Sequence, residues 1–69
     1  MNTLKHVRIA VFRCNQVEFA AIAGVRQGTV SRWEAGQLQP SLQQMRLIRE
    51  EAKRRGIVWD DRWFFEAVA

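Results

Sequence analysis

The sequence predicts an all-α fold, a compact bundle of five short helices in one domain over residues 1–69. Apolar residues recur at spacings of three and four along most of the chain, which is the period of an amphipathic helix. Asn15 and Ser41 each stand three positions before Glu or Gln, a pattern typical of helix starts. Glycines follow three of the periodic segments, where helices commonly end. Together these signals predict helices throughout and no strand.

The first half of the chain is predicted to hold three helices. Residues 3–13 form the first, because four apolar residues share one of its faces: Leu4, Val7, Val11 and Cys14. Asn15 and Glu18 form a capping box for a second helix over residues 16–22, whose buried face carries Phe19, Ala20 and Ala23. Gly24 ends this helix, because glycine adopts a left-handed backbone without a steric cost. The sharp turn leads into a third helix over residues 27–35, which ends at Gly36.

The second half is predicted to hold two more helices. Ser41 and Gln44 form a second capping box, and the helix after it turns four apolar residues inward: Leu42, Met45, Ile48 and Ala52. The run 53–55 places three cations in its last turn, where they complement the helix dipole. A short last helix is expected after Asp60, with four apolar residues roughly on one face: Trp63, Phe64, Ala67 and Val68.

Charge and cysteine content narrow the classes of function. The net charge is +4, and the whole excess lies in residues 1–33, which hold five basic side chains and one acidic. This distribution favours a polyanionic partner. The single cysteine rules out an internal disulfide, and no Cys/His cluster predicts a metal site. No apolar run approaches the roughly 20 residues of a membrane span, and no signal peptide is recognisable, so a cytoplasmic protein with no membrane contact is expected.

Residues 16–40 carry the motif with functional content. They read QVEFAAIAGVRQGTVSRWEAGQLQP, which resembles the Cro/C1-type helix-turn-helix family of phage and bacterial repressors. The resemblance rests on the opening Gln and Glu, the turn glycine, the Thr-Val-Ser stretch, the Trp-Glu-x-Gly end and the proline beyond. It implies a lambda repressor-like DNA-binding domain with a central helix-turn-helix. In this geometry the helix over residues 27–35 lies in the major groove of double-stranded DNA.

The resemblance also implies roles for individual residues. Base readers are expected at four positions of one polar face: Gln27, Gly28, Ser31 and Arg32. Arg32 suits guanine and Gln27 suits adenine, with a plain phosphate contact as the alternative for Arg32. Gln16 and Arg26 are expected to contact phosphates. Trp33 is interpreted as a core residue, and Glu34 is expected to pair with Arg8, although the spacing from Arg8 to Gln16 is one residue longer than the family pattern.

The segment 57–69 is rich in aromatic residues, more than so small a domain is expected to bury alone. If two of them cap the core, an exposed apolar patch remains, and such patches commonly mark protein contacts. The predicted use is a homodimer interface formed by Trp59, Trp63, Phe64 and Val68. Dimerisation would also stabilise a domain that buries only about 60% of the surface of its unfolded chain.

Two functions of different classes fit these observations. The first is an autoregulatory homodimeric repressor of a phage or mobile element, which binds a pseudo-palindromic operator; activation is a variant of it. The second is an antitoxin or other protein-binding module whose aromatic tail binds a partner protein. An enzyme is not expected, because no catalytic set is present: His6 is interpreted as solvated and Cys14 as a core thiol. No cofactor, metal or small-molecule ligand is expected either.

Overall fold

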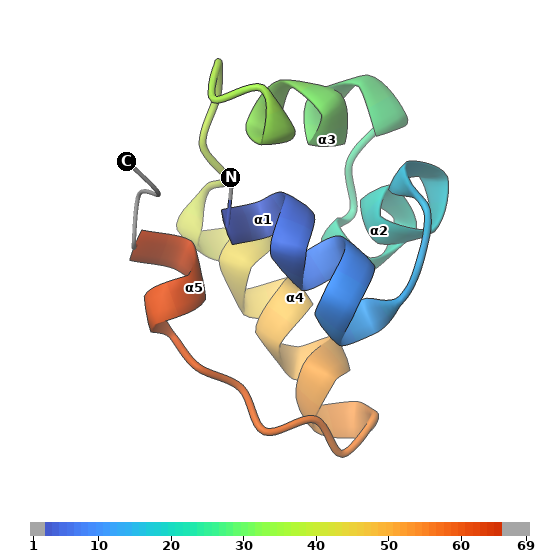
Figure 1. The fold of residues 1–69 in the computed structure, drawn as a ribbon, viewed down its shortest axis with the longest axis vertical. Coiled ribbons are helices and arrows are strands. Elements are labelled where there is room, and N and C mark those ends of the chain that lie inside the picture. The colour runs from blue at the N-terminus through green and yellow to red at the C-terminus, as the bar shows by residue number, and fades with distance from the viewer. Residues whose placement is uncertain (1–2, 66–69) are drawn as a thin grey trace.

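Helices form all the regular structure in residues 3–65, the part of the chain that this computed structural model describes (Figure 1). In order they are α1 (Thr3–His6), η1 (Val7–Phe12), α2 (Gln16–Ala23), α3 (Gln27–Glu34), α4 (Leu42–Arg54) and α5 (Arg62–Phe65). Because α1 and η1 are continuous, the all-α fold of five helical segments is confirmed. Within this described part, no helix has the length and apolar character that crossing a membrane requires.

The first helical segment changes its winding half-way. η1 is a π-helix, and the N–H groups of Arg13 and Cys14 both donate to the carbonyl oxygen of Arg8. The prediction of a regular α-helix through Arg13 is therefore wrong in its winding and one residue too long. Arg13 instead adopts a left-handed backbone (φ 53°). Because a π-turn holds one more residue than an α-turn, Val7 and Phe12, five positions apart, are both buried.

The backbone conformation of the turn between α2 and α3 favours glycine. Gly24 ends α2, as predicted, with a left-handed backbone (φ 70°), although the helix itself runs to Ala23, one residue past its predicted end. At the other end of α2 the predicted capping box is confirmed, because the side chains of Asn15 and Glu18 each accept a hydrogen bond from the other's backbone N–H. Since α2 and α3 also pack against each other, local geometry determines how α3 lies on the bundle.

α4 begins with the second predicted capping box, between Ser41 and Gln44. Ile48 and Ala52 are fully buried, as predicted. Leu42 is not: 78% of its surface is exposed, so the prediction that it points into the core is wrong. Leu42 is the first residue of α4, and the nearest fully buried residue of this helix lies six positions further on. The first turn of α4 therefore extends beyond the core.

The core lies mainly between the first helical segment, α2, α3 and α4. Its largest fully buried side chains are Trp33, Phe19, Ile48, Val7 and Val30. The rings of Phe19 and Trp33 meet edge to face, with centroids 6.4 Å apart. Trp33 is thus a structural residue, as the sequence predicts, and it anchors the inner face of α3.

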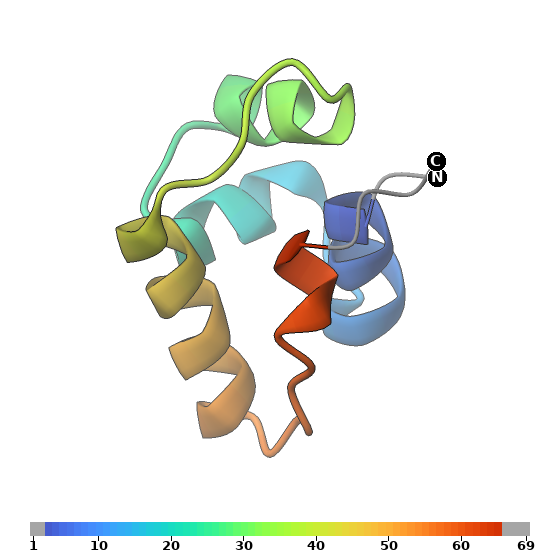
Figure 2. The same ribbon diagram turned by 90° about the vertical axis from the view of Figure 1, so that its left-hand side faces the viewer.

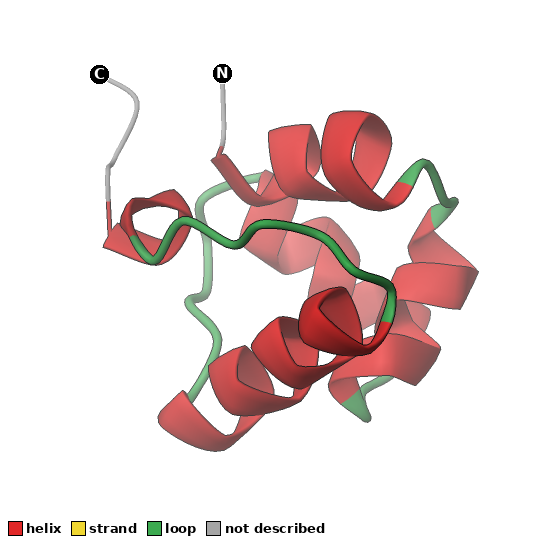
Figure 3. Cartoon of the chain, turned by 90° about the horizontal axis from the view of Figure 1, so that it is seen from below, coloured by secondary structure: helices red, strands yellow, loops and turns green. Residues whose placement is uncertain are grey.

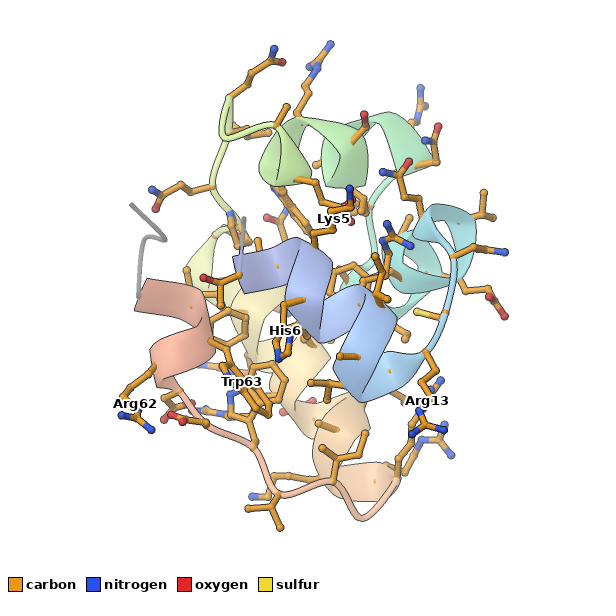
Figure 4. The ribbon with its side chains drawn as sticks, viewed as in Figure 1. Lys5, His6, Arg13, Arg62 and Trp63 are labelled. Atoms are coloured by element: carbon orange, nitrogen blue, oxygen red, sulfur yellow. The ribbon has the colours of Figure 1, made fainter. Side chains whose placement is uncertain are left out.

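The C-terminal aromatic residues pack on this core more than the sequence predicts. The loop after α4 crosses the bundle and places α5 beside α1 (Figures 2 and 3). Trp59, Trp63 and Phe64 are half-buried, and the Trp59 ring lies 4.9 Å from Trp63 and 5.0 Å from Phe64 between centroids. The Trp63 ring also meets exposed His6 edge to face (Figure 4). The predicted interface stays a prediction, because Ala67, Val68 and the side chain of Phe65 lie outside the described residues.

Candidate nucleic-acid interface

α3 presents a polar face to solvent and an apolar face to the core. The four positions predicted to read bases are all exposed: Gln27, Gly28, Ser31 and Arg32. On the inner face, Val30 and Trp33 are at most 1% exposed. Figure 1 shows α3 at one end of the molecule, with its outer side turned away from the other helices. This arrangement leaves the polar face free to enter a groove of DNA.

Arg26 begins α3 without capping it through its side chain, in keeping with the poor cap that its sequence offers. Its backbone is extended, and its carbonyl oxygen accepts from Thr29 and Val30 N–H at 3.0 and 3.4 Å. The exposed guanidinium stands at the positive end of the helix dipole, where a cation is unfavourable. An anion bound beside this turn would reverse that cost, which fits the predicted phosphate contact.

A part-buried ion pair ties α3 to the first helical segment, as the sequence predicts. Arg8 Nε donates to Glu34 Oε2 over 2.6 Å, and Arg8 Nη2 donates to Glu34 Oε1 over 3.1 Å. The two side chains are only 13% and 7% exposed. Burial acts to raise the pKa of Glu34, but hydrogen bonds from Arg8 and Gln16 outweigh it and hold that pKa below its usual range. Glu34 is therefore a charged anchor at neutral pH.

Glu34 also begins a chain of hydrogen bonds that reaches the exposed face of α3. Because a carboxylate only accepts, the Gln16 amide turns its Nε2 toward Glu34 Oε1 (3.1 Å) and its Oε1 away. Gln16 Oε1 then accepts from Gln27 Nε2 over 2.5 Å. The second hydrogen of Gln16 Nε2 is left to donate to a phosphate. Gln27 keeps one N–H and its carbonyl oxygen, the donor and acceptor that adenine N7 and N6 require.

Basic side chains approach α3 from more than one element. Arg26 is the N-cap residue of α3 and Arg32 lies in its last turn, and both are exposed. Lys5, which the sequence analysis did not single out, extends from α1 toward α3, and its charge helps to lower the pKa of Glu34 (Figure 4). Its place three residues before Arg8, nearly one helical turn, was the available signal. Arg13 points away from α3 in the same view, so not all of the basic first half faces this end.

Comparison with known families identifies the motif that forms this face. The family model described as helix-turn-helix, of the Cro/C1 type, matches residues 13–53, more than half of the chain. The chain belongs to the Cro/C1-type helix-turn-helix family. The match runs from the end of the first helical segment through α2 and α3 into the last turns of α4. Neither the curated proteins nor the solved structures gave a match.

Membership makes this helix-turn-helix protein a DNA-binding transcription regulator, with α3 in the place of the recognition helix. The family is a regulatory domain and not an enzyme family. Burial raises the pKa of the Cys14 thiol, which keeps it protonated and poorly nucleophilic at neutral pH. Among the described residues, no group of three or more His, Cys, Asp and Glu side chains could hold a metal ion.

The π-turn explains how this helix-turn-helix protein accommodates the longer spacing between Arg8 and Gln16. A turn closed over one more residue absorbs the extra position inside η1. Arg8 therefore still reaches Glu34, and its Nη1 also donates to the carbonyl oxygen of Cys14 over 3.1 Å. The side chain that aligns α3 keeps its place although the chain before α2 is longer.

Gly28 provides a first test of how closely DNA approaches α3. Its backbone is outside the left-handed region, and a Cβ built there meets no atom within 4 Å, so the fold does not require glycine. Gly28→Ala is expected to raise the free energy of unfolding by about 0.5 kcal/mol through helix propensity. The same substitution is expected to weaken binding to the preferred DNA site about tenfold, if the duplex packs against the bare backbone.

Thermal melting and DNA titration of the same Gly28→Ala preparation check both halves of this expectation. Ser31→Ala is the comparison variant on the same exposed face: it removes a polar group that is expected to contact DNA, whereas Gly28→Ala adds volume. An alanine variant that is more stable and binds DNA as tightly as the parent would show that the duplex stays clear of this position.

Proposed function

We propose that this protein is a homodimeric repressor that binds a pseudo-palindromic operator in double-stranded DNA and controls its own promoter. Gln27, Gly28, Ser31 and Arg32 read base edges in each half-site, while Gln16 and Arg26 contact phosphates. Two copies would place two α3 helices about one DNA turn apart, near 34 Å, as dimeric helix-turn-helix proteins do.

The observation that carries this proposal is the orientation of Gln27 by Gln16. An exposed glutamine on a helix ordinarily samples many rotamers, and fixing them on binding costs free energy. Here the bond to Gln16, itself held by Glu34, holds the Gln27 amide before DNA arrives. A preorganised donor and acceptor on a solvent-facing helix favours base readout over a general contact with polyanions.

The packing of the C-terminal aromatic residues weighs against the antitoxin alternative. A tail that seals a partner protein would hold its aromatic side chains ready for that partner. Trp59 and Trp63 are instead half-buried against their own domain. Whether the protein represses or activates depends on where its site lies relative to the promoter, and a reporter placed behind that site decides the sign.

Selection of random duplex DNA by the purified chain tests the proposal most directly. Enrichment of a two-fold sequence with half-sites about one turn apart, bound with a steep dependence on salt, is the expected result. The enriched site should also occur upstream of the gene that encodes the protein. Weak binding without sequence enrichment would contradict base readout and leave only non-specific association with DNA.

Gln16→Ala is expected to weaken binding to every sequence by about tenfold per half-site, because a hydrogen bond from an amide to an anionic phosphate contributes roughly 1.5 kcal/mol. It should also blunt the preference at the base that Gln27 reads, since Gln27 loses the partner that orients it. The slope of log affinity against log salt should not change, because glutamine carries no charge.

Arg26→Ala is the matched comparison for Gln16→Ala. It removes a charge from the same phosphate-facing region, so it should lower the salt slope by about 0.9 per half-site while leaving base preference intact. Titrations at several salt concentrations separate the two variants. If Gln16→Ala leaves affinity unchanged for all sequences, the phosphate role of this residue is wrong.

A further inference from the structure

Among the described residues, the fold also leaves uncovered an open groove between α4 and α5. It encloses about 210 Å³ and is lined by Leu42, Met45, Arg46, Arg49, Asp61 and Phe64. We refer to it as the α4–α5 groove. It lies at the side of the bundle where α5 faces the first turns of α4, and α3 is not part of it (Figures 1 and 2).

The α4–α5 groove contains apolar side chains that the monomer does not bury in its own core. The apolar stripe of α4 buries its later residues, Ile48 and Ala52, completely in the core. The same stripe continues into the groove with Met45 half-exposed and Leu42 78% exposed. Phe64 of α5 borders it from the other side. Apolar side chains at the centre with charged side chains around them are the arrangement found in protein contacts.

The charges on the rim of the groove indicate which partner it fits. Arg46 and Arg49 of α4 stand beside Asp61, and Arg49 lies 3.5 Å from Asp61 while both remain largely exposed. A two-fold contact places one patch against a copy of itself, so the patch must carry both signs of charge. Arginines and an aspartate on one rim meet this condition. An acidic peptide would be matched better by a rim of cations alone.

The position of the groove also fits a second copy. Its lining residues belong to α4, α5 and the residue before α5, and α3, whose outer side is turned away from the other helices, contributes none of them (Figure 1). The molecule measures 29 × 25 × 22 Å, and α3 lies at one end of it, so the two α3 helices of adjoining copies can lie farther apart than one molecular width. The roughly 34 Å between successive major-groove faces on one side of DNA requires such a separation.

We propose that a second copy of this chain docks groove to groove about a two-fold axis, with Leu42, Met45 and Phe64 at the centre of the contact. The inference rests on the proposed dimeric function and gives it a defined surface. Of the residues predicted to form the interface, Phe64 stays in the contact, while Trp59 and Trp63 have a supporting role because their rings pack on the core of their own chain. The arginines of one copy then face Asp61 of the other.

Leu42→Glu tests this surface, with Val58→Glu as its matched control. Both leucine and valine are highly exposed, at 78% and 91%, so neither change disturbs the core, but only Leu42 lines the groove. Sedimentation equilibrium of the full chain, from low-micromolar to sub-millimolar concentration, is expected to give twice 8.1 kDa for the parent and for Val58→Glu. Leu42→Glu is expected to give the monomer mass with an unchanged melting curve.

DNA binding separates failure of this inference from failure of the proposed function. Leu42→Glu should bind a single half-site as the parent does, and lose the extra affinity of the parent for two half-sites. A Leu42→Glu protein that still has the dimer mass overturns the groove as the interface. If the parent chain stays monomeric both alone and on a duplex with two half-sites, a second copy does not occupy the groove. If no duplex is bound specifically, the proposed function fails. The masses from sedimentation equilibrium still show whether the groove is the dimer interface.

Discussion

Arg8→Ala is expected to lower the free energy of unfolding by about 3 kcal/mol, because it leaves the carboxylate of Glu34 desolvated without its counter-ion. A domain of this size has a total stability of only about 3–10 kcal/mol, so the loss is a large part of it. The melting temperature should fall by more than about 10 °C. The substitution should also reduce specific DNA binding, since Glu34 holds Gln16, which in turn holds Gln27.

Arg54→Ala is the matched control for Arg8→Ala. Arg54 also pairs with a glutamate, Glu51, but its side chain is 72% exposed, so solvent replaces the lost interaction. Its melting temperature should stay close to that of the parent. Equal losses from the two substitutions would mean that the pair between Arg8 and Glu34 contributes no more than a surface salt bridge.

The same buried pair gives a dependence of stability on pH. The pKa of Glu34 is lower in the folded chain than its ordinary value near 4.3, so the folded state favours the charged form. Its contribution is therefore complete above the ordinary value and is lost as the pH falls through the lowered pKa of the folded chain. Denaturant unfolding between neutral pH and about pH 3 should show a smaller acid loss for Glu34→Gln, which cannot titrate there.

Local signals in the sequence predicted the parts of the fold that local chemistry determines. The two capping boxes and the left-handed turn at Gly24 each depend on residues within four positions of one another, and each is present as predicted. The exposed and buried faces of α3 follow equally from its helical period. Such features need no knowledge of the rest of the chain, which is why periodicity and turn chemistry were sufficient.

The features that the sequence did not predict depend on distant neighbours or on departures from the regular helical period. The residue types of η1 suit an α-helix equally well, so its π-winding has no signal in the local sequence. Leu42 has the right spacing for burial but lies beyond the end of the core. The bond between Gln16 and Gln27 joins residues eleven positions apart on two helices, so each could be assigned a role but not a connection.

Arg32→Ala is expected to remove base preference at one position of each half-site, because arginine donates two parallel hydrogen bonds to guanine O6 and N7. A bidentate contact of this kind is worth about 1–3 kcal/mol, so discrimination at that base pair should fall by roughly 5- to 150-fold. Preference at the position that Gln27 reads should persist, since the two side chains lie more than one helical turn apart. The measurement is a sequence profile selected in parallel with the parent protein, with Arg32→Ala and with Arg32→Lys.

Arg32→Lys decides between base readout and the alternative of a phosphate contact. Lysine keeps the positive charge but lacks the planar fork, so it preserves a phosphate contact and loses the paired donors to guanine. If Arg32 reads a base, Arg32→Lys should keep the salt slope of the parent and still lose the preference at that position. An unchanged sequence profile for both substitutions would assign Arg32 to the DNA backbone. Direct readout would then rest on Gln27 and Ser31, and specificity would have to come largely from the shape of the operator.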